Sequence, residues 1–259
     1  MANPTLQKQF GALPAANAAA DQTLSTATTP VTMGAEVPMT LAGTAIKTAF
    51  LLALVLGAGA WGWTLVDPDA ATIAIPGWWW LVLIGAVILA IVTSFRPQLA
   101  IVTGPLYAVA QGVVVGAISH IYEAEFEGII IQALLAAASV FMVMLVLFVT
   151  RTIRVTSRMR GVIIGATAGI ALFYLVSIVL ALFGVTMPFV WDSGPFGILF
   201  SILVVGIAAF NLMLDFDLIE RAVTARAPRV MEWFGAFALM VTIVWLYIEI
   251  LRLIAKVRD

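Results

Sequence analysis

The sequence has no cysteine and only one histidine among its 259 residues. The missing thiols exclude disulfides, thiolate catalysis and cysteine-based metal sites, and one histidine leaves no room for a histidine-rich site. Lysine is almost as rare, since it occurs only as Lys8, Lys47 and Lys256. A heptahelical pigment binds retinal through a lysine in the middle of its last helix, so the chain does not fit that class.

Catalytic sequence patterns are missing as well. The chain contains no HExxH zinc motif, no P-loop, no glycine-rich dinucleotide fingerprint and no paired membrane aspartates in a GxGD setting. Charged residues make up 10% of the chain, whereas a soluble domain has about 25%. We therefore expect no enzyme, no resident cofactor and no nucleic acid partner.

What the chain does contain is hydrophobic sequence, at 63% of residues and a mean hydropathy of +1.11. Seven long runs are almost free of charge, and each is close to the roughly 20 residues that cross a hydrocarbon core of about 30 Å as a helix. The predicted helices cover residues 44–66, 75–95, 98–122, 129–150, 161–184, 195–220 and 231–255. This pattern predicts an all-α, polytopic membrane protein with membrane lipid around it.

The loops sort by charge. Arginines fall in every second connection, at Arg96, within 151–160 and within 221–229, and the alternate connections contain no Lys or Arg. Because basic loops stay on the cytoplasmic side, the N-terminus is predicted to be cytoplasmic. The tryptophans support this prediction, since most of them lie near the opposite face, where indole rings favour the headgroup region. We expect the membrane to be a bacterial plasma membrane.

The two ends of the chain differ from the middle. Residues 1–43 are rich in Ala, Thr, Pro, Asn and Gln and show no apolar period, which predicts a disordered cytoplasmic tail. Residues 44–255 form the predicted bundle, and residues 256–259 form a short C-terminal tail. The seventh helix carries basic residues toward the outer face against the charge rule, so a re-entrant or tilted helix sheltered by the bundle is the alternative to a full crossing.

Ionisable groups inside membrane helices are costly and often mark a functional path. Asp215 and Asp217 lie late in the sixth predicted helix, and about 200° separates them around its axis. For Asp215 the alternatives are a functional carboxylate or one paired structurally with Arg96 or another arginine at that edge. Glu249 in the seventh helix is either functional or the i,i+3 partner of Arg252. Asp217 is either functional or a solvated interfacial acid.

Two further patterns have a structural and a functional interpretation. Glycines four residues apart occur at Gly161, Gly165 and Gly169 and again at Gly112 and Gly116, and for these we favour close helix packing over a smooth pore lining. Three glutamates follow His120 in the connection after the third helix. They either concentrate cations at a pore mouth or form an ordinary solvated loop, which we favour.

The string FRPQLAIVTGPLYAVAQGVVVGAISHIYE and a sixth helix ending in LMLDFDLIE resemble the transmembrane Bax inhibitor motif family over about residues 44–255. The resemblance implies seven helices with a central last helix and a pH-sensitive calcium leak. It places the family's sixth-helix aspartate at Asp215 and its second-helix arginine at Arg96. The family's seventh-helix aspartate falls on Thr242, which cannot ionise, and Glu249 lies two turns later.

These observations give two hypotheses for function. In the first, the chain is a pH-sensitive calcium or cation leak channel in which Asp215 and Arg96 hold the cytoplasmic end shut. Asp215 and Glu249 are then the candidate cation ligands, since oxygen ligands suit calcium, and Asp217 is a further gating candidate. In the second, the chain is a membrane regulator that binds a membrane protease or another membrane protein without transport.

Overall fold

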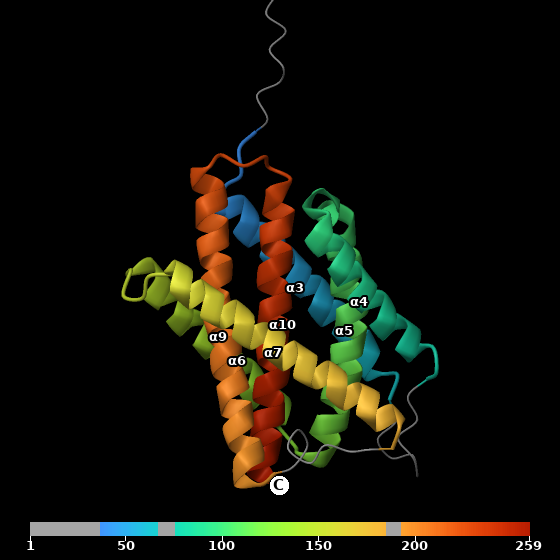
Figure 1. The fold of residues 1–259 in the computed structure, drawn as a ribbon. Helices are drawn as coiled ribbons and strands as arrows, with labels where there is room; N and C mark the ends of the chain where they lie inside the picture. Colours follow the sequence, from blue (N-terminus) through green and yellow to red (C-terminus); the bar gives the residue numbers. More distant parts are fainter. Residues whose placement is uncertain (1–36, 67–75, 185–192) are drawn as a thin grey trace, which may run out of the picture. The chain divides into compact units, whose positions relative to one another are not determined.

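A computed structural model describes residues 37–66, 76–184 and 193–259. Within these ranges the chain is helical and has no strand (Figure 1). The described residues form seven α-helices and one short 3-10 helix, which are α3 (Leu41–Trp63), α4 (Trp79–Phe95), η1 (Pro97–Leu99), α5 (Ala100–Glu125), α6 (Ile129–Val149), α7 (Ser157–Leu182), α9 (Pro195–Thr224) and α10 (Met231–Arg258). The all-α, seven-helix prediction is confirmed.

Six of these helices are long and apolar enough to cross a membrane. The exception is α4, whose 17 residues span about 25 Å at 1.5 Å per residue. It follows residues 67–75, which lie outside the described part of the chain. Large hydrophobic side chains are exposed on the outer faces of the helices, for example Ile46, Leu81 and Ile131, as expected where lipid surrounds the protein.

The last helix lies at the centre of the bundle, as predicted. In its apolar stretch 67% of residues are buried, against 22% in α3 and 17% in α7. It packs against α9, α3, α6 and α5, and Figure 1 shows it running alongside α9 for much of its length. It is one continuous helix of 28 residues.

The helical bundle extends beyond the predicted residues 44–255 at both ends. Helix α3 begins at Leu41, where the side chain of Thr40 caps it by accepting from the backbone N of Gly43 at 2.9 Å. Met39 is buried and its backbone N donates to the carbonyl of Ala227 at 2.8 Å, so residues 38–43 belong to the folded part. Residues 1–36 of the predicted tail lie outside the described residues. At the other end α10 continues to Arg258.

The two glycine stripes behave differently. A Cβ placed on Gly116 would overlap the carbonyl group of Gly59, and one on Gly112 would lie 2.5 Å from the carbonyl oxygen of Val55. The stripe on α5 therefore lets the backbones of α3 and α5 touch, as predicted. On α7 the predicted packing is not formed among the described residues, since a Cβ at Gly161, Gly165 or Gly169 would meet none of them within 4 Å.

Candidate functional site

Asp215 lies on α9, where it faces the central helix. Its Oδ2 accepts a hydrogen bond from Thr242 Oγ1 of α10 at 2.6 Å, and its side chain is half-buried. Thr242 is the position at which the family resemblance places the seventh-helix aspartate. The structure thus brings together the two expected positions, with a hydroxyl in place of the second carboxylate.

Arg96 does not reach this carboxylate. It is the C-terminal cap of α4 and its side chain is exposed. The ion pairs within the described ranges include neither Arg96 nor Asp215. The predicted contact that would close the channel, between carboxylate and guanidinium, is therefore not formed, and Asp215 has no basic partner among the residues that the structure describes.

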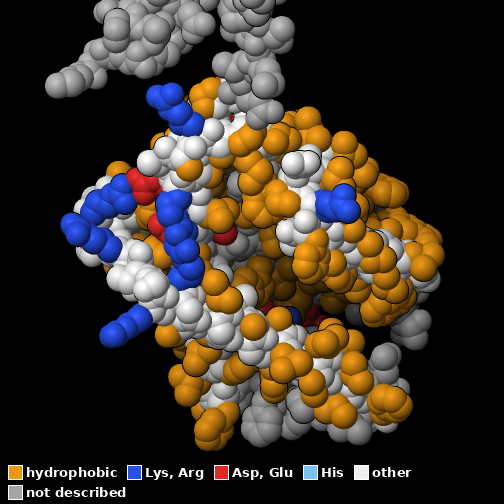
Figure 2. All heavy atoms as spheres, turned by 45° about the horizontal axis from the view of Figure 1, so that its top comes forward, with side chains coloured by type: hydrophobic (Ala, Val, Ile, Leu, Met, Phe, Trp, Pro, Cys, Tyr) orange, Lys and Arg blue, Asp and Glu red, His pale blue; other side chains and the backbone are white. Residues whose placement is uncertain are grey.

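Asp217 belongs to a separate cluster at the end of the bundle that holds the arginine-rich connections, which we call the basic end. Its Oδ2 accepts from Arg160 at 2.7 Å and lies 2.6 Å from Arg221 Nη2, and both arginines are more than one-third exposed. Figure 2, which turns this end forward, shows Lys and Arg side chains gathered mostly on one flank. The geometry matches the interfacial interpretation of Asp217.

The same cluster contains an ion pair between Arg151 and Glu220. The hydrogen bond and the charge of Glu220 raise the pKa of the Arg151 guanidinium above its ordinary value, so this arginine stays charged. Both side chains are partly exposed, and such pairs contribute little to stability. The pair joins Glu220 of α9 to Arg151 in the α6–α7 connection.

Glu249 is 1% exposed and lies in a polar cluster near the opposite end of α10. It accepts hydrogen bonds from the hydroxyl of Tyr174 at 3.0 Å and from the indole N–H of Trp245 at 3.2 Å, and Arg252 Nη1 lies 3.4 Å from its Oε2. Arg252 also donates to Tyr174 at 2.7 Å. The alternative in which Glu249 pairs with Arg252 is therefore present, together with an unexpected tyrosine from α7.

Asp215 and Glu249 do not share one site. Thr242, which binds Asp215, is seven residues before Glu249, or about 10 Å along the helix. No group of three or more Asp, Glu, His or Cys residues in the described ranges is placed to hold a metal ion. Any cation at Asp215 would have to complete its shell of six to eight oxygens with hydroxyl, carbonyl and water oxygens.

Sequence reasoning missed two buried charges. Lys256, in the predicted C-terminal tail, donates to the carbonyl of Gly197 at 3.2 Å and to Ser201 at 3.0 Å, so it anchors α10 to the start of α9. Glu232 pairs with Lys47 of α3 and accepts from the backbone N of Thr40 at 2.9 Å. The signal was available, because charges inside otherwise apolar segments need partners.

The acidic connection has a structural role for one of its members. Glu123 accepts from the backbone N of Gly128 at 2.7 Å and of Ile130 at 3.2 Å, so it caps the first turn of α6. The ring of His120 stacks on Trp63 and bonds to its carbonyl at 2.9 Å. These contacts support the structural interpretation of the loop over a cation-gathering one.

A profile of the family described as Bax inhibitor 1 like matches residues 3–259, essentially the whole chain. Comparison with curated proteins finds no match, and comparison with solved structures finds none either.

Proposed function

Because this chain belongs to the Bax inhibitor 1 like family, we propose that it is a pH-sensitive calcium or cation leak channel in which Asp215 is the titrating group. One observation carries the proposal. A half-buried carboxylate on a membrane helix has a hydroxyl but no Lys or Arg opposite it in the described residues. An acid in that setting is free to take up a cation or a proton.

The proposed gate acts at the contact between α9 and α10. When Asp215 is charged, the hydroxyl of Thr242 donates to it at 2.6 Å, and a hydrogen bond to an ionised acceptor is stronger than one to a neutral acceptor. Protonation removes that charge and weakens the link between the two helices. The leak then increases as the pH falls.

Glu249 has a separate part in this proposal. Its two oxygens already accept from Tyr174, and Arg252 neutralises its charge. Glu249 can bind a passing cation only if Arg252 moves away, because the cation must compete with the Arg252 guanidinium for the same carboxylate. We therefore place Glu249 as a second, weaker binding step beyond Asp215.

Replacing Asp215 with asparagine is expected to abolish the pH response of calcium flux. Asparagine keeps the shape and a hydrogen-bonding oxygen but cannot change charge. The parent protein in dye-loaded liposomes should leak more calcium at mildly acidic than at neutral pH, and Asp215→Asn should leak equally at both. The measurement is the ratio of the two initial rates.

Two variants serve as controls. Asp217→Asn removes a carboxylate only two residues away, which is already paired with arginines, and it should keep the parental ratio. Thr242→Val should raise flux at neutral pH while leaving some pH response, since the titrating group remains. If Asp215→Asn retains the parental ratio, Asp215 is not the titrating group.

The second candidate function is the regulator that binds a membrane protein without transport. The exposed glycines of α7 favour it, because nothing in the described part of the chain covers that face. Calcium flux in liposomes distinguishes the two functions. A regulator shows no calcium flux in liposomes of the purified chain, whereas a leak channel needs no partner.

A further inference from the structure

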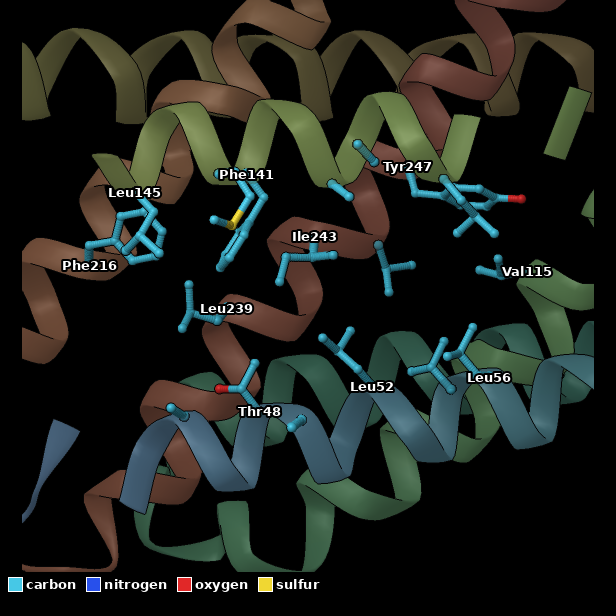
Figure 3. Close-up of a pocket in the computed structure, with 18 of the residues that line it drawn as sticks. Thr48, Leu52, Leu56, Val115, Phe141, Leu145, Phe216, Leu239, Ile243 and Tyr247 are labelled. Carbon is cyan, nitrogen blue, oxygen red and sulfur yellow. The ribbon is translucent and has the colours of Figure 1, made fainter. Parts of the chain in front are cut away.

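An apolar groove of about 1260 Å³ lies between α3 and α6, with α10 as its floor (Figure 3). Side chains labelled in Figure 3 that point into it include Leu52, Leu56, Phe141, Leu145, Leu239 and Ile243. Leu56 and Met142 line it and are more than half exposed, so the groove opens toward the surrounding bilayer. Asp215 is not among its lining residues.

Polar side chains along the groove already have partners. The hydroxyls of Ser119 and Tyr247 bond to each other at 2.8 Å. Those of Thr44 and Thr48 donate to carbonyls four residues earlier in the chain, at Thr40 and Thr44. The groove between its ends therefore offers no ligand to a cation or a polar solute, and it suits hydrocarbon.

The groove extends along nearly all of α3, from Leu41 to Trp63, about 33 Å at 1.5 Å per residue. This length matches the hydrocarbon thickness of a bilayer. An acyl chain of one leaflet spans about half of this thickness, so it can lie in the half of the groove next to its headgroup at the membrane surface.

One end of the groove lies at the basic end of the bundle, where Arg151 and Glu220 line it as an ion pair. Phe148 and Arg151 line both this groove and a second cavity of about 350 Å³, which Arg154 and Asp217 also line. The carboxylate of Asp217 is occupied by arginines from α7 and α9. Arg154 is exposed and has no acidic partner within the described ranges, so its guanidinium is available to an anion at the mouth of the groove.

We propose that this groove is a binding site for an anionic phospholipid, with an acyl chain between α3 and α6 and the phosphate at Arg154. Hydrocarbon lies along the apolar part of the groove next to the basic end, and the negative headgroup meets that end. Basic residues at a membrane surface contribute about 1 kcal/mol each toward anionic lipid, which predicts about a fivefold preference over a zwitterionic lipid. This site does not depend on ion conduction.

Native mass spectrometry of the purified full chain tests the proposal. The protein is stripped of lipid in detergent and titrated with phosphatidylglycerol or phosphatidylcholine. The parent should bind phosphatidylglycerol about fivefold more tightly, and Arg154→Gln should remove that preference. Ala138→Trp, which fills the groove from α6, should reduce the retention of both lipids.

Matched variants keep the test specific. Arg158→Gln removes a nearby exposed arginine that lines neither cavity, and Ala168→Trp adds the same ring to the exposed face of α7. Both should bind lipid like the parent. Equal retention by Ala138→Trp and the parent would overturn the proposal, as would equal affinity for the two lipids. A dimer that Ala138→Trp breaks would assign the groove to a second copy and overturn it as well.

Discussion

Glu249→Leu is expected to lower the free energy of unfolding by about 3–5 kcal/mol, the usual cost of breaking a buried ion pair by removing one partner. Leucine leaves Arg252 without its counter-charge in the interior, where its side chain is only 17% exposed. It also leaves the Tyr174 hydroxyl and the Trp245 indole without their acceptor. The measurement is an unfolding titration with sodium dodecyl sulfate in mixed micelles.

A double variant shows whether the uncompensated charge is the cause. Replacing Arg252 with methionine in the Glu249→Leu background removes both charges, and an apolar substitute for a buried pair is often close to neutral. The double variant should therefore be more stable than Glu249→Leu alone. If the loss in the double variant equals the sum of the losses in Glu249→Leu and Arg252→Met, the two residues are not energetically coupled. That result would show that this account of the cluster is wrong.

Gly116→Ala is the second substitution with a large expected effect. The new methyl group would overlap the backbone carbonyl of Gly59, and a backbone group cannot turn aside as a side chain can. The helices α3 and α5 must then separate, and overpacking of this kind costs about 1–3 kcal/mol. The same detergent titration measures the loss, and a lowered thermal midpoint should accompany it.

Gly165→Ala is the matched control for this prediction. It makes the same chemical change on α7, where the added Cβ meets nothing within 4 Å. Alanine favours a helix over glycine by about 1 kcal/mol, so this variant should be as stable as the parent or slightly more stable. Equal losses at Gly116 and Gly165 would contradict the tight contact between α3 and α5.

The sequence was sufficient to predict the architecture and the position of Asp215. Uncharged segments and sorted loop charges depend on local composition, so seven helices and their approximate bounds could be read directly. The resemblance placed the family's sixth-helix aspartate at Asp215 and its seventh-helix aspartate at Thr242. In the structure a hydrogen bond joins these two residues. A short span such as α4 and the ends of α3 and α10 depend on caps and tertiary contacts, so their bounds were less accurate.

Partner choice could not be predicted in the same way. Arg96 is suitable by type and depth, but its place at the end of α4 leaves it exposed. Tyr174 meets Glu249 and Arg252 only because this part of α7 reaches that part of α10. Such contacts depend on how helices rotate about their axes, which residue spacing within one helix does not determine.

The central position of α10 has a consequence for biogenesis. The ribosome makes this helix after α3, α7 and α9, yet it carries Glu232, Glu249, Arg252 and Lys256, whose partners include side chains of those three helices. Basic and acidic residues resist partitioning from the translocon into lipid. Helix α10 must therefore enter the membrane against helices that are already inserted, so the described bundle is complete only after α10 has been synthesised.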